Sequence, residues 1–91
     1  MKLCGQIEYA DEAVVRGNFI AGGLRLGIGI ADYGEIADPT LVQLARQMLS
    51  AGKAGDAEGY VAARGQAAAR CQALGRPIAV GGIQCVTTPC P

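Results

Sequence analysis

Residues 13–31 read AVVRGNFIAGGLRLGIGIA, and the conformation of this stretch decides the fold class of the chain. Apolar residues alternate with polar residues or glycines on both sides of the pair Gly22-Gly23. Alternation with a period of two is typical of strands, and glycine accepts the positive φ that a two-residue hairpin turn needs. The pattern predicts a β-hairpin that turns at Gly22-Gly23.

The competing interpretation is a helix from Glu12 to Ile30. Five glycines fall within that range, and each costs a helix interior roughly 1 kcal/mol relative to alanine. This cost favours the hairpin. A buried helix that packs closely through its glycines stays open as the alternative.

Strand-like patterns also occur near both ends of the chain. Residues 2–9, KLCGQIEY, alternate well enough to predict a short strand. Gly81-Gly82 is flanked by short β-prone runs, which predict a second hairpin with strands 77–80 and 83–87.

The central part has the start and stop signals of two helices. Asp38 is an N-cap acid followed by Pro39, and Gly52 is the expected end of this helix. Asp56 caps the next helix, which Gly75 and a nearby proline should end. The link is short, so the two helices should be antiparallel neighbours. The first helix has an apolar stripe that should be buried: Leu41, Leu44, Ala45, Met48 and Leu49.

Together these elements predict a single domain, 1–91, of the α+β class. A small antiparallel sheet, made of the N-terminal strand and the two Gly-Gly hairpins, would accompany a central antiparallel helical hairpin. The alternative is a mostly α fold with a glycine-rich, buried N-terminal helix.

Composition excludes some partners and favours others. Eight basic and eight acidic residues give a formal net charge of zero, which lacks the basic footprint of a nucleic-acid-binding protein. The start of the chain has no apolar segment typical of a secretory leader, and no apolar run is long enough to span a membrane. We therefore expect a cytoplasmic protein, or part of a particle assembled in the cytoplasm, without nucleic-acid or membrane partners.

Four cysteines are the main candidates for a metal or redox site: Cys4, Cys71, Cys85 and Cys90. With no histidine in the chain, a zinc ion would need all four, and the usual pair of closely spaced cysteine knuckles is missing. A Cys85–Cys90 disulfide is sterically possible, but its loop is short and a reducing cytosol opposes it. The favoured interpretation is that Cys4 and Cys71 are small buried hydrophobic residues. We expect no cofactor.

Catalysis has little support in the sequence. Without histidine there is no Cys-His or Ser-His pair to generate a nucleophile, and we expect no catalytic residue. Large apolar side chains are also few for a domain of this size, with one phenylalanine and no tryptophan. Small chains with a thin core often depend on a partner or a covalent staple.

The leading functional hypothesis is therefore a small, non-catalytic interaction or assembly protein, such as a particle subunit or an inhibitor that docks on a larger complex. Its partner would be protein, in a homo-oligomer or a larger complex. The alternatives are a metal- or ligand-binding protein that uses the four cysteines, and a small oligomeric enzyme with sites at subunit interfaces. Candidate partner-binding residues come from the glycine-bearing strand face and the proline-rich tail: Arg25, Gly27, Gly29, Thr87, Thr88, Pro89 and Pro91.

Overall fold

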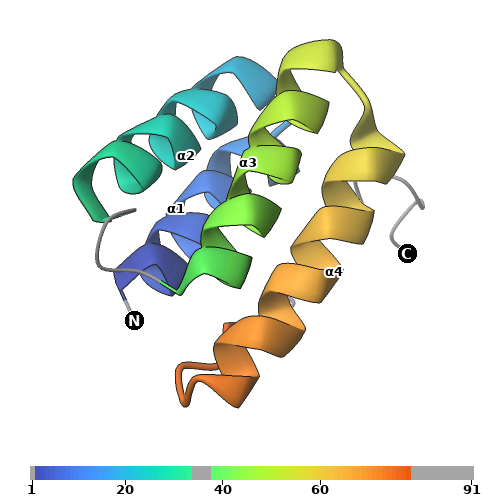
Figure 1. The fold of residues 1–91 in the computed structure, drawn as a ribbon. Coiled ribbons are helices and arrows are strands. Elements are labelled where there is room, and N and C mark those ends of the chain that lie inside the picture. Colours follow the sequence, from blue (N-terminus) through green and yellow to red (C-terminus); the bar gives the residue numbers. More distant parts are fainter. Residues whose placement is uncertain (1, 34–37, 79–91) are drawn as a thin grey trace.

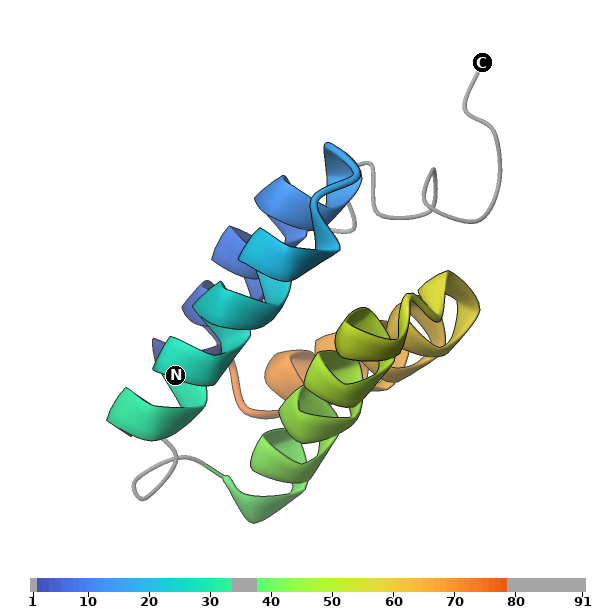
Figure 2. The same cartoon turned by 90° about the horizontal axis from the view of Figure 1, so that it is seen from above.

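A computed structural model describes residues 2–33 and 38–78 of the chain. Within them the fold consists of four α-helices (Figure 1): α1 Lys2–Val15, α2 Phe19–Tyr33, α3 Pro39–Ala54 and α4 Ala57–Ala73. Helices α1 and α2 form one antiparallel hairpin, and α3 and α4 form a second one (Figure 2). The hairpins pack side by side, with α2 against α3, so that one apolar core is shared by all four helices.

The expectation of an α+β fold is wrong, because the residues that the structure describes contain no strand. Residues 2–9 belong to α1, and the stretch predicted as a hairpin is the end of α1, a tight turn and α2. The alternative of a mostly α fold is correct in its class, but the glycine-rich, buried helix that it assumed from Glu12 to Ile30 is not, because a turn separates α1 from α2 and much of α2 is exposed. The strands predicted at 77–80 and 83–87 lie almost entirely outside the described residues, and the two that are described, Pro77 and Ile78, are not in a strand.

Close packing between α1 and α2 explains why a helix tolerates so many glycines. A Cβ atom built on Gly22 would lie 2.5 Å from Cγ2 of Val14, and one on Gly29 would lie 2.8 Å from Cβ of Gln6. These two glycines are seven residues apart, so they lie on the same face of α2. Their missing side chains let the backbones approach closely, which offsets the low helix propensity of glycine.

The turn between α1 and α2 is built from Gly17 and Asn18. Gly17 has a φ of 84°, a conformation that favours glycine, and the amide of Asn18 donates to the carbonyl of Ala13. The side chain of Asn18 accepts a hydrogen bond of 3.0 Å from the amide of Ala21 and so caps α2. A helix therefore ends and another begins within three residues.

The start signals of the second hairpin are confirmed. Asp38 accepts a hydrogen bond from the amide of Leu41, and Asp56 accepts one from the amide of Gly59. The predicted end at Gly52 is wrong, because α3 continues to Ala54 and ends at Gly55, whose φ is 70°. A buried glycine at position 52 instead lets α3 pass close to Phe19 and Tyr60.

The core contains four residues of the apolar stripe predicted for α3, namely Leu41, Leu44, Ala45 and Met48, whereas Leu49 is only partly buried. Met48 is fully buried and Leu44 is 7% exposed, as expected from the sequence. The other large core side chains include Leu3, Ile7, Val14, Leu26, Leu41 and Tyr60. Much of α4 contributes only alanine and cysteine to this core, which keeps α4 close to its neighbours.

Candidate functional site

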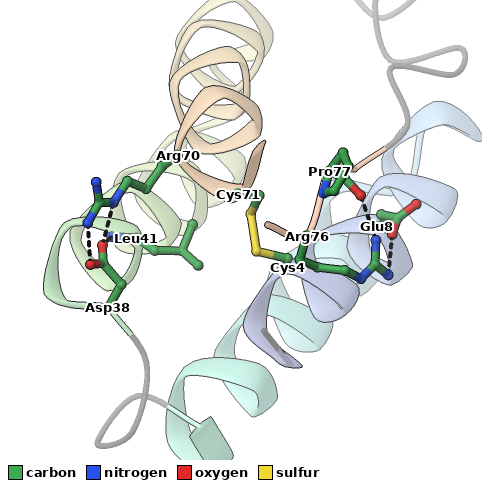
Figure 3. Close-up of a disulfide and its surroundings, with 8 residues drawn as sticks. All are labelled: Cys4, Glu8, Asp38, Leu41, Arg70, Cys71, Arg76 and Pro77. Atoms are coloured by element: carbon green, nitrogen blue, oxygen red, sulfur yellow. Dashed lines mark hydrogen bonds and ion pairs between the residues drawn. A yellow bond between two sulfur atoms is a disulfide. The ribbon is translucent and has the colours of Figure 1, made fainter. Parts of the chain in front are cut away.

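A disulfide joins the start of α1 to the end of α4. Cys4 and Cys71 are bonded across a sequence separation of 67 residues, and both are fully buried (Figure 3). The prediction that these two residues are buried is confirmed, but they are bonded to each other and are not separate hydrophobic side chains. Because the fold brings the N-terminal and C-terminal helices together, the two isolated cysteines become neighbours.

This bond also removes the metal site considered for the cysteines. Two of the four sulfur atoms are oxidised and cannot serve as thiolate ligands. Among residues 2–33 and 38–78, no group of three or more metal-ligating side chains gathers at one place. Cys85 and Cys90 lie outside the described residues, and so does the disulfide considered between them.

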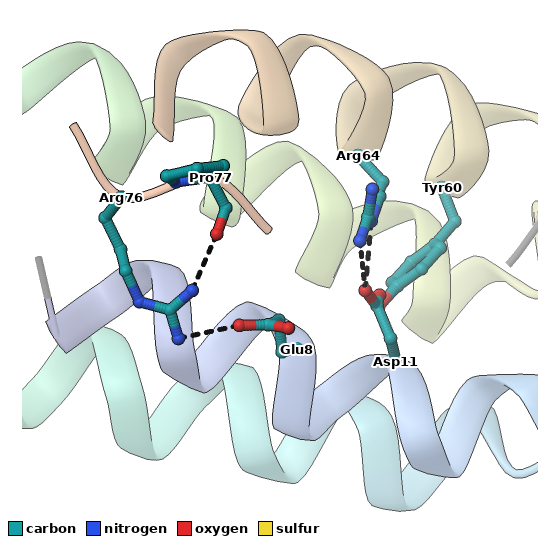
Figure 4. A network of polar contacts seen from close by, with 6 residues as sticks. All are labelled: Glu8, Asp11, Tyr60, Arg64, Arg76 and Pro77. Atoms are coloured by element: carbon teal, nitrogen blue, oxygen red, sulfur yellow. Dashed lines mark hydrogen bonds and ion pairs between the residues drawn. The ribbon is translucent and has the colours of Figure 1, made fainter. Parts of the chain in front are cut away.

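A buried charged cluster lies further along the same pair of helices. Asp11 of α1 accepts hydrogen bonds from Nε of Arg64 at 2.9 Å and from the hydroxyl of Tyr60 at 3.1 Å (Figure 4). Asp11 is 8% exposed and Arg64 is 3% exposed. Burial raises the pKa of the Asp11 carboxyl, although the charge and hydrogen bond of Arg64 act in the opposite direction. Burial is also the main reason why the pKa of Tyr60 is raised.

A third link attaches the segment after α4 to α1. Nη2 of Arg76 lies 2.7 Å from Oε1 of Glu8, and Nη1 donates to the carbonyl of Pro77 (Figure 4). We call these three features together the α1–α4 seam: the Cys4–Cys71 bond, the Asp11 cluster and the Glu8–Arg76 pair.

The contacts within the α1–α4 seam are typical of a region that holds helices together. In the described part of the chain, every buried side-chain nitrogen and oxygen has a hydrogen-bond partner. Asp11, Tyr60 and Arg64 point at one another from two packed helices, and their polar groups contact each other. A fully partnered buried network rigidifies a core and fixes how its helices pair.

The opposite side of the molecule has a different character. Ile20, Leu24 and Ile28 of α2 are 84%, 67% and 51% exposed. Their spacing of four residues places them in one row along the helix. We call this row the α2 outer face. Single exposed apolar residues are ordinary, but three aligned ones on a small protein form a continuous patch.

A groove runs beside the α2 outer face, between α2 and α3. Its volume is about 560 Å³, and Leu49, Gly52 and Lys53 of α3 form part of its wall. On the α2 side, the groove is lined by Gly23 and Gly27, which have no side chains to narrow it. A Cβ atom on Gly27 would have no neighbour within 4 Å. Among the described residues that line the groove, Lys53 is the one with a charged side chain, so this part of the groove suits an apolar side chain.

The structure separates the site residues predicted from the sequence. Gly27 lines the groove. Gly29 instead packs against Gln6, and Arg25 lies over the ring of Tyr9, at 3.8 Å from its centre, while donating to the Tyr9 carbonyl. These two positions attach α2 to α1, so the three residues do not share a strand face. The tail candidates Thr87, Thr88, Pro89 and Pro91 lie outside the described residues.

Sequence reasoning missed the α2 outer face because it assigned this stretch to a strand. A signal was nevertheless present, since Ile20, Leu24 and Ile28 recur at helical spacing. Gly17-Asn18 was the second missed signal, because a helix-ending glycine followed by a capping asparagine marks a junction between two helices.

Comparisons with known proteins do not indicate a function for the chain. No protein-family model, no curated protein and no solved structure matches the chain. Within the described residues, no helix has both the length and the apolar character that crossing a membrane requires.

Proposed function

We propose that this chain is a non-catalytic interaction module, which binds protein through the α2 outer face and the adjoining groove. The observation that carries the proposal is the exposure of Ile20, Leu24 and Ile28 in one row beside a groove of about 560 Å³. Large apolar side chains that are exposed on a helix can be removed from water when a partner covers them, which favours binding. Such patches commonly mark protein interfaces.

The α1–α4 seam supports this proposal, because it stabilises the fold without the α2 outer face. The α1–α4 seam supplies the stability that a small core lacks, through a disulfide and a buried ion pair. With the fold closed on that side, the chain tolerates an apolar helix face that contributes little to its own core.

The disulfide further supports action in an oxidising compartment, because disulfides rarely persist where cellular thiols are kept reduced. This differs from the cytoplasmic location expected from the sequence. Thiol trapping of Cys4 and Cys71 in extracts of the source cells distinguishes the two. Protected, oxidised cysteines support the oxidising compartment, and fully labelled thiols support the cytoplasm.

Comparative affinity capture tests the interaction itself. The bait proteins are the full chain, Leu24→Glu, and Ala69→Glu as the control that adds the same charge to an exposed position of α4. We expect a protein partner, identified by mass spectrometry, that the wild type and Ala69→Glu retain and Leu24→Glu loses. Equal recovery by all three baits, or no protein recovered by any, would contradict the proposal.

A further inference from the structure

Each of the two hairpins holds its helices together by contacts of its own. In the first, Nη1 of Arg25 in α2 donates to the carbonyl of Tyr9 in α1 at 2.7 Å, and the close packing through the glycines of α2 adds to this link. In the second, Nε of Arg70 in α4 donates to a carboxylate oxygen of Asp38, at the start of α3, at 2.8 Å. Each hairpin is therefore linked internally by polar contacts as well as by packing.

Packing between α1 and α4 is much sparser than packing within either hairpin. Apart from Tyr60, the side chains that α4 buries are those of Ala63, Arg64, Ala67 and Cys71. Alanine and cysteine are small, so bringing α1 against α4 removes little apolar area from water. Outside the α1–α4 seam, the hairpins are joined mainly where α2 packs against α3.

Water can replace the polar links of the α1–α4 seam. Desolvation cancels much of the attraction in a buried ion pair, and Asp11 and Arg64 regain their hydration when they separate. Glu8 and Arg76 already contact water, since their side chains are 33% and 42% exposed. Among the three links of the seam, the disulfide is the one that water cannot replace. The state of this bond therefore determines whether α1 can move away from α4.

We infer that the disulfide makes the α1–α4 seam a redox-sensitive switch. When a dithiol reductant opens the bond, α1 separates from α4, while both hairpins keep their helices and α2 stays against α3. The protein then has a closed form in oxidising surroundings and an open form in reducing ones, with a local covalent change as the trigger. The switch is independent of the α2 outer face, so its test leaves the proposed function unaffected.

The redox step transfers two electrons and two protons from the dithiol to the protein. A thiolate of the reductant attacks one sulfur of the bond, which forms a mixed disulfide and releases the other cysteine as a thiolate. The second thiolate of the reductant then attacks the reductant's own sulfur in the mixed disulfide, which releases the second cysteine and leaves the reductant as a disulfide. Each released cysteine takes up one of the two protons that the reductant has given to the solvent.

The reductant reaches the bond at helix ends. Both cysteines are fully buried, so attack needs a local opening. Cys4 lies in the first turn of α1 and Cys71 in the last turn of α4, where such opening costs least. The bond can therefore be reduced without unfolding of the whole chain.

Thiol labelling of the full, reduced chain tests the switch. The chain is reduced with dithiothreitol, desalted without oxygen and treated with iodoacetamide at increasing urea concentrations, while mass spectrometry follows each cysteine. Relative to the unfolded chain, Cys4 and Cys71 should be labelled at one common rate, at least about tenfold faster than global unfolding allows. The urea dependence of this rate should be less than about half that of global unfolding, because a partial opening exposes less surface. Far-UV circular dichroism should show that the reduced chain keeps its helix content.

Each of three results would overturn the inference. A urea dependence equal to that of global unfolding would mean that the reduced chain opens only by unfolding. Unequal rates at Cys4 and Cys71 would mean that the two helix ends fray separately. Loss of helix content on reduction would mean that the bond is needed for folding itself.

Two variants test whether the α1–α4 seam opens as one unit. Asp11→Asn removes the charge opposite Arg64, about two turns from Cys4, and should speed the labelling of both cysteines by about tenfold or more. Arg70→Gln is the matched control, because it breaks an ion pair directly beside Cys71 that joins α4 to α3 and not to α1. This control should change the labelling rates by less than about threefold. Equal effects of the two variants, or no effect of Asp11→Asn, would overturn the switch, and the wild-type urea series remains the test if Asp11→Asn does not fold.

Discussion

The α1–α4 seam and the α2 outer face differ in the kind of side chain that each exposes to solvent. At the seam, charged and sulfur-bearing side chains from distant parts of the sequence are paired, with the disulfide and the Asp11–Arg64 pair buried and the Glu8–Arg76 pair partly exposed. On the outer face, large apolar side chains are left in water. The difference indicates that polar and covalent links close this fold, while part of its apolar surface is available for another molecule.

The largest expected effect is the removal of the buried cation at the seam. Arg64→Met leaves the Asp11 carboxylate buried without its charged partner, which should lower the free energy of unfolding by about 3–5 kcal/mol. Urea denaturation at neutral pH measures this. Arg16→Met is the control, because the Arg16 and Glu12 side chains are 76% and 59% exposed and such pairs contribute at most about 1 kcal/mol. Similar losses in the two variants would remove the distinction between seam and surface.

Loss of the disulfide should rank next. Replacing both Cys4 and Cys71 by alanine should destabilise the fold by about 2–4 kcal/mol, since the bond constrains a long loop in the unfolded chain. Unfolding of the wild type with and without reductant should show a comparable difference. The double replacement of Cys85 and Cys90 by alanine is the control, and we expect it to leave the unfolding midpoint nearly unchanged. A wild type that is insensitive to reductant would show that the seam does not depend on this bond.

A fall in pH should weaken the ion pair between Asp38 and Arg70, which lies outside the α1–α4 seam. Asp38 caps α3 and accepts hydrogen bonds from Arg70, which hold its pKa at about 2, below the ordinary 3.8 (Figure 3). A lowered pKa means that the ion pair stabilises the fold above the ordinary value and that this contribution is lost as the pH falls toward 2.

Asp38→Asn isolates this contribution, because asparagine is also a good cap but carries no charge. The stability difference between the wild type and this variant should shrink between pH 6 and pH 2, as followed by thermal melts. A difference that stays constant over that range would mean that the charge on Asp38 does not stabilise α3.

The helix starts of the second half and the end of α4 were predictable from sequence because their signals are local, whereas Gly52 lies inside α3 beside Phe19 and Tyr60 and was wrongly taken as its end. Asp38-Pro39 and Asp56 start helices by offering an oxygen to amides three residues away. Gly75, with a φ of 84°, ends α4 as expected. Each of these signals depends only on neighbours in the chain, so tertiary packing does not change its meaning.

The first half was mispredicted because its glycines are tertiary signals. Gly22 and Gly29 are needed where α2 meets Val14 and Gln6, and that contact exists only once α1 and α2 are paired. Without the pairing, glycine indicates a turn or a bulge rather than a helix interior.

The seam could not be predicted for a related reason. Four cysteines allow three complete pairings, and only the fold brings Cys4 beside Cys71. Asp11 and Arg64 are likewise 53 residues apart in sequence and meet only across the packed helices.

The most direct test of the account compares two leucines that lie two residues apart in α2. Leu24 is 67% exposed and Leu26 is fully buried, so the same change to alanine probes the outer face and the core within one helix. By urea denaturation at low protein concentration, Leu26→Ala should lose about 2–5 kcal/mol, whereas Leu24→Ala should stay within about 0.5 kcal/mol of the wild type. A loss of 2 kcal/mol or more for Leu24→Ala, at about the level of Leu26→Ala, would show that the α2 outer face belongs to the core of the fold and is not a free binding surface.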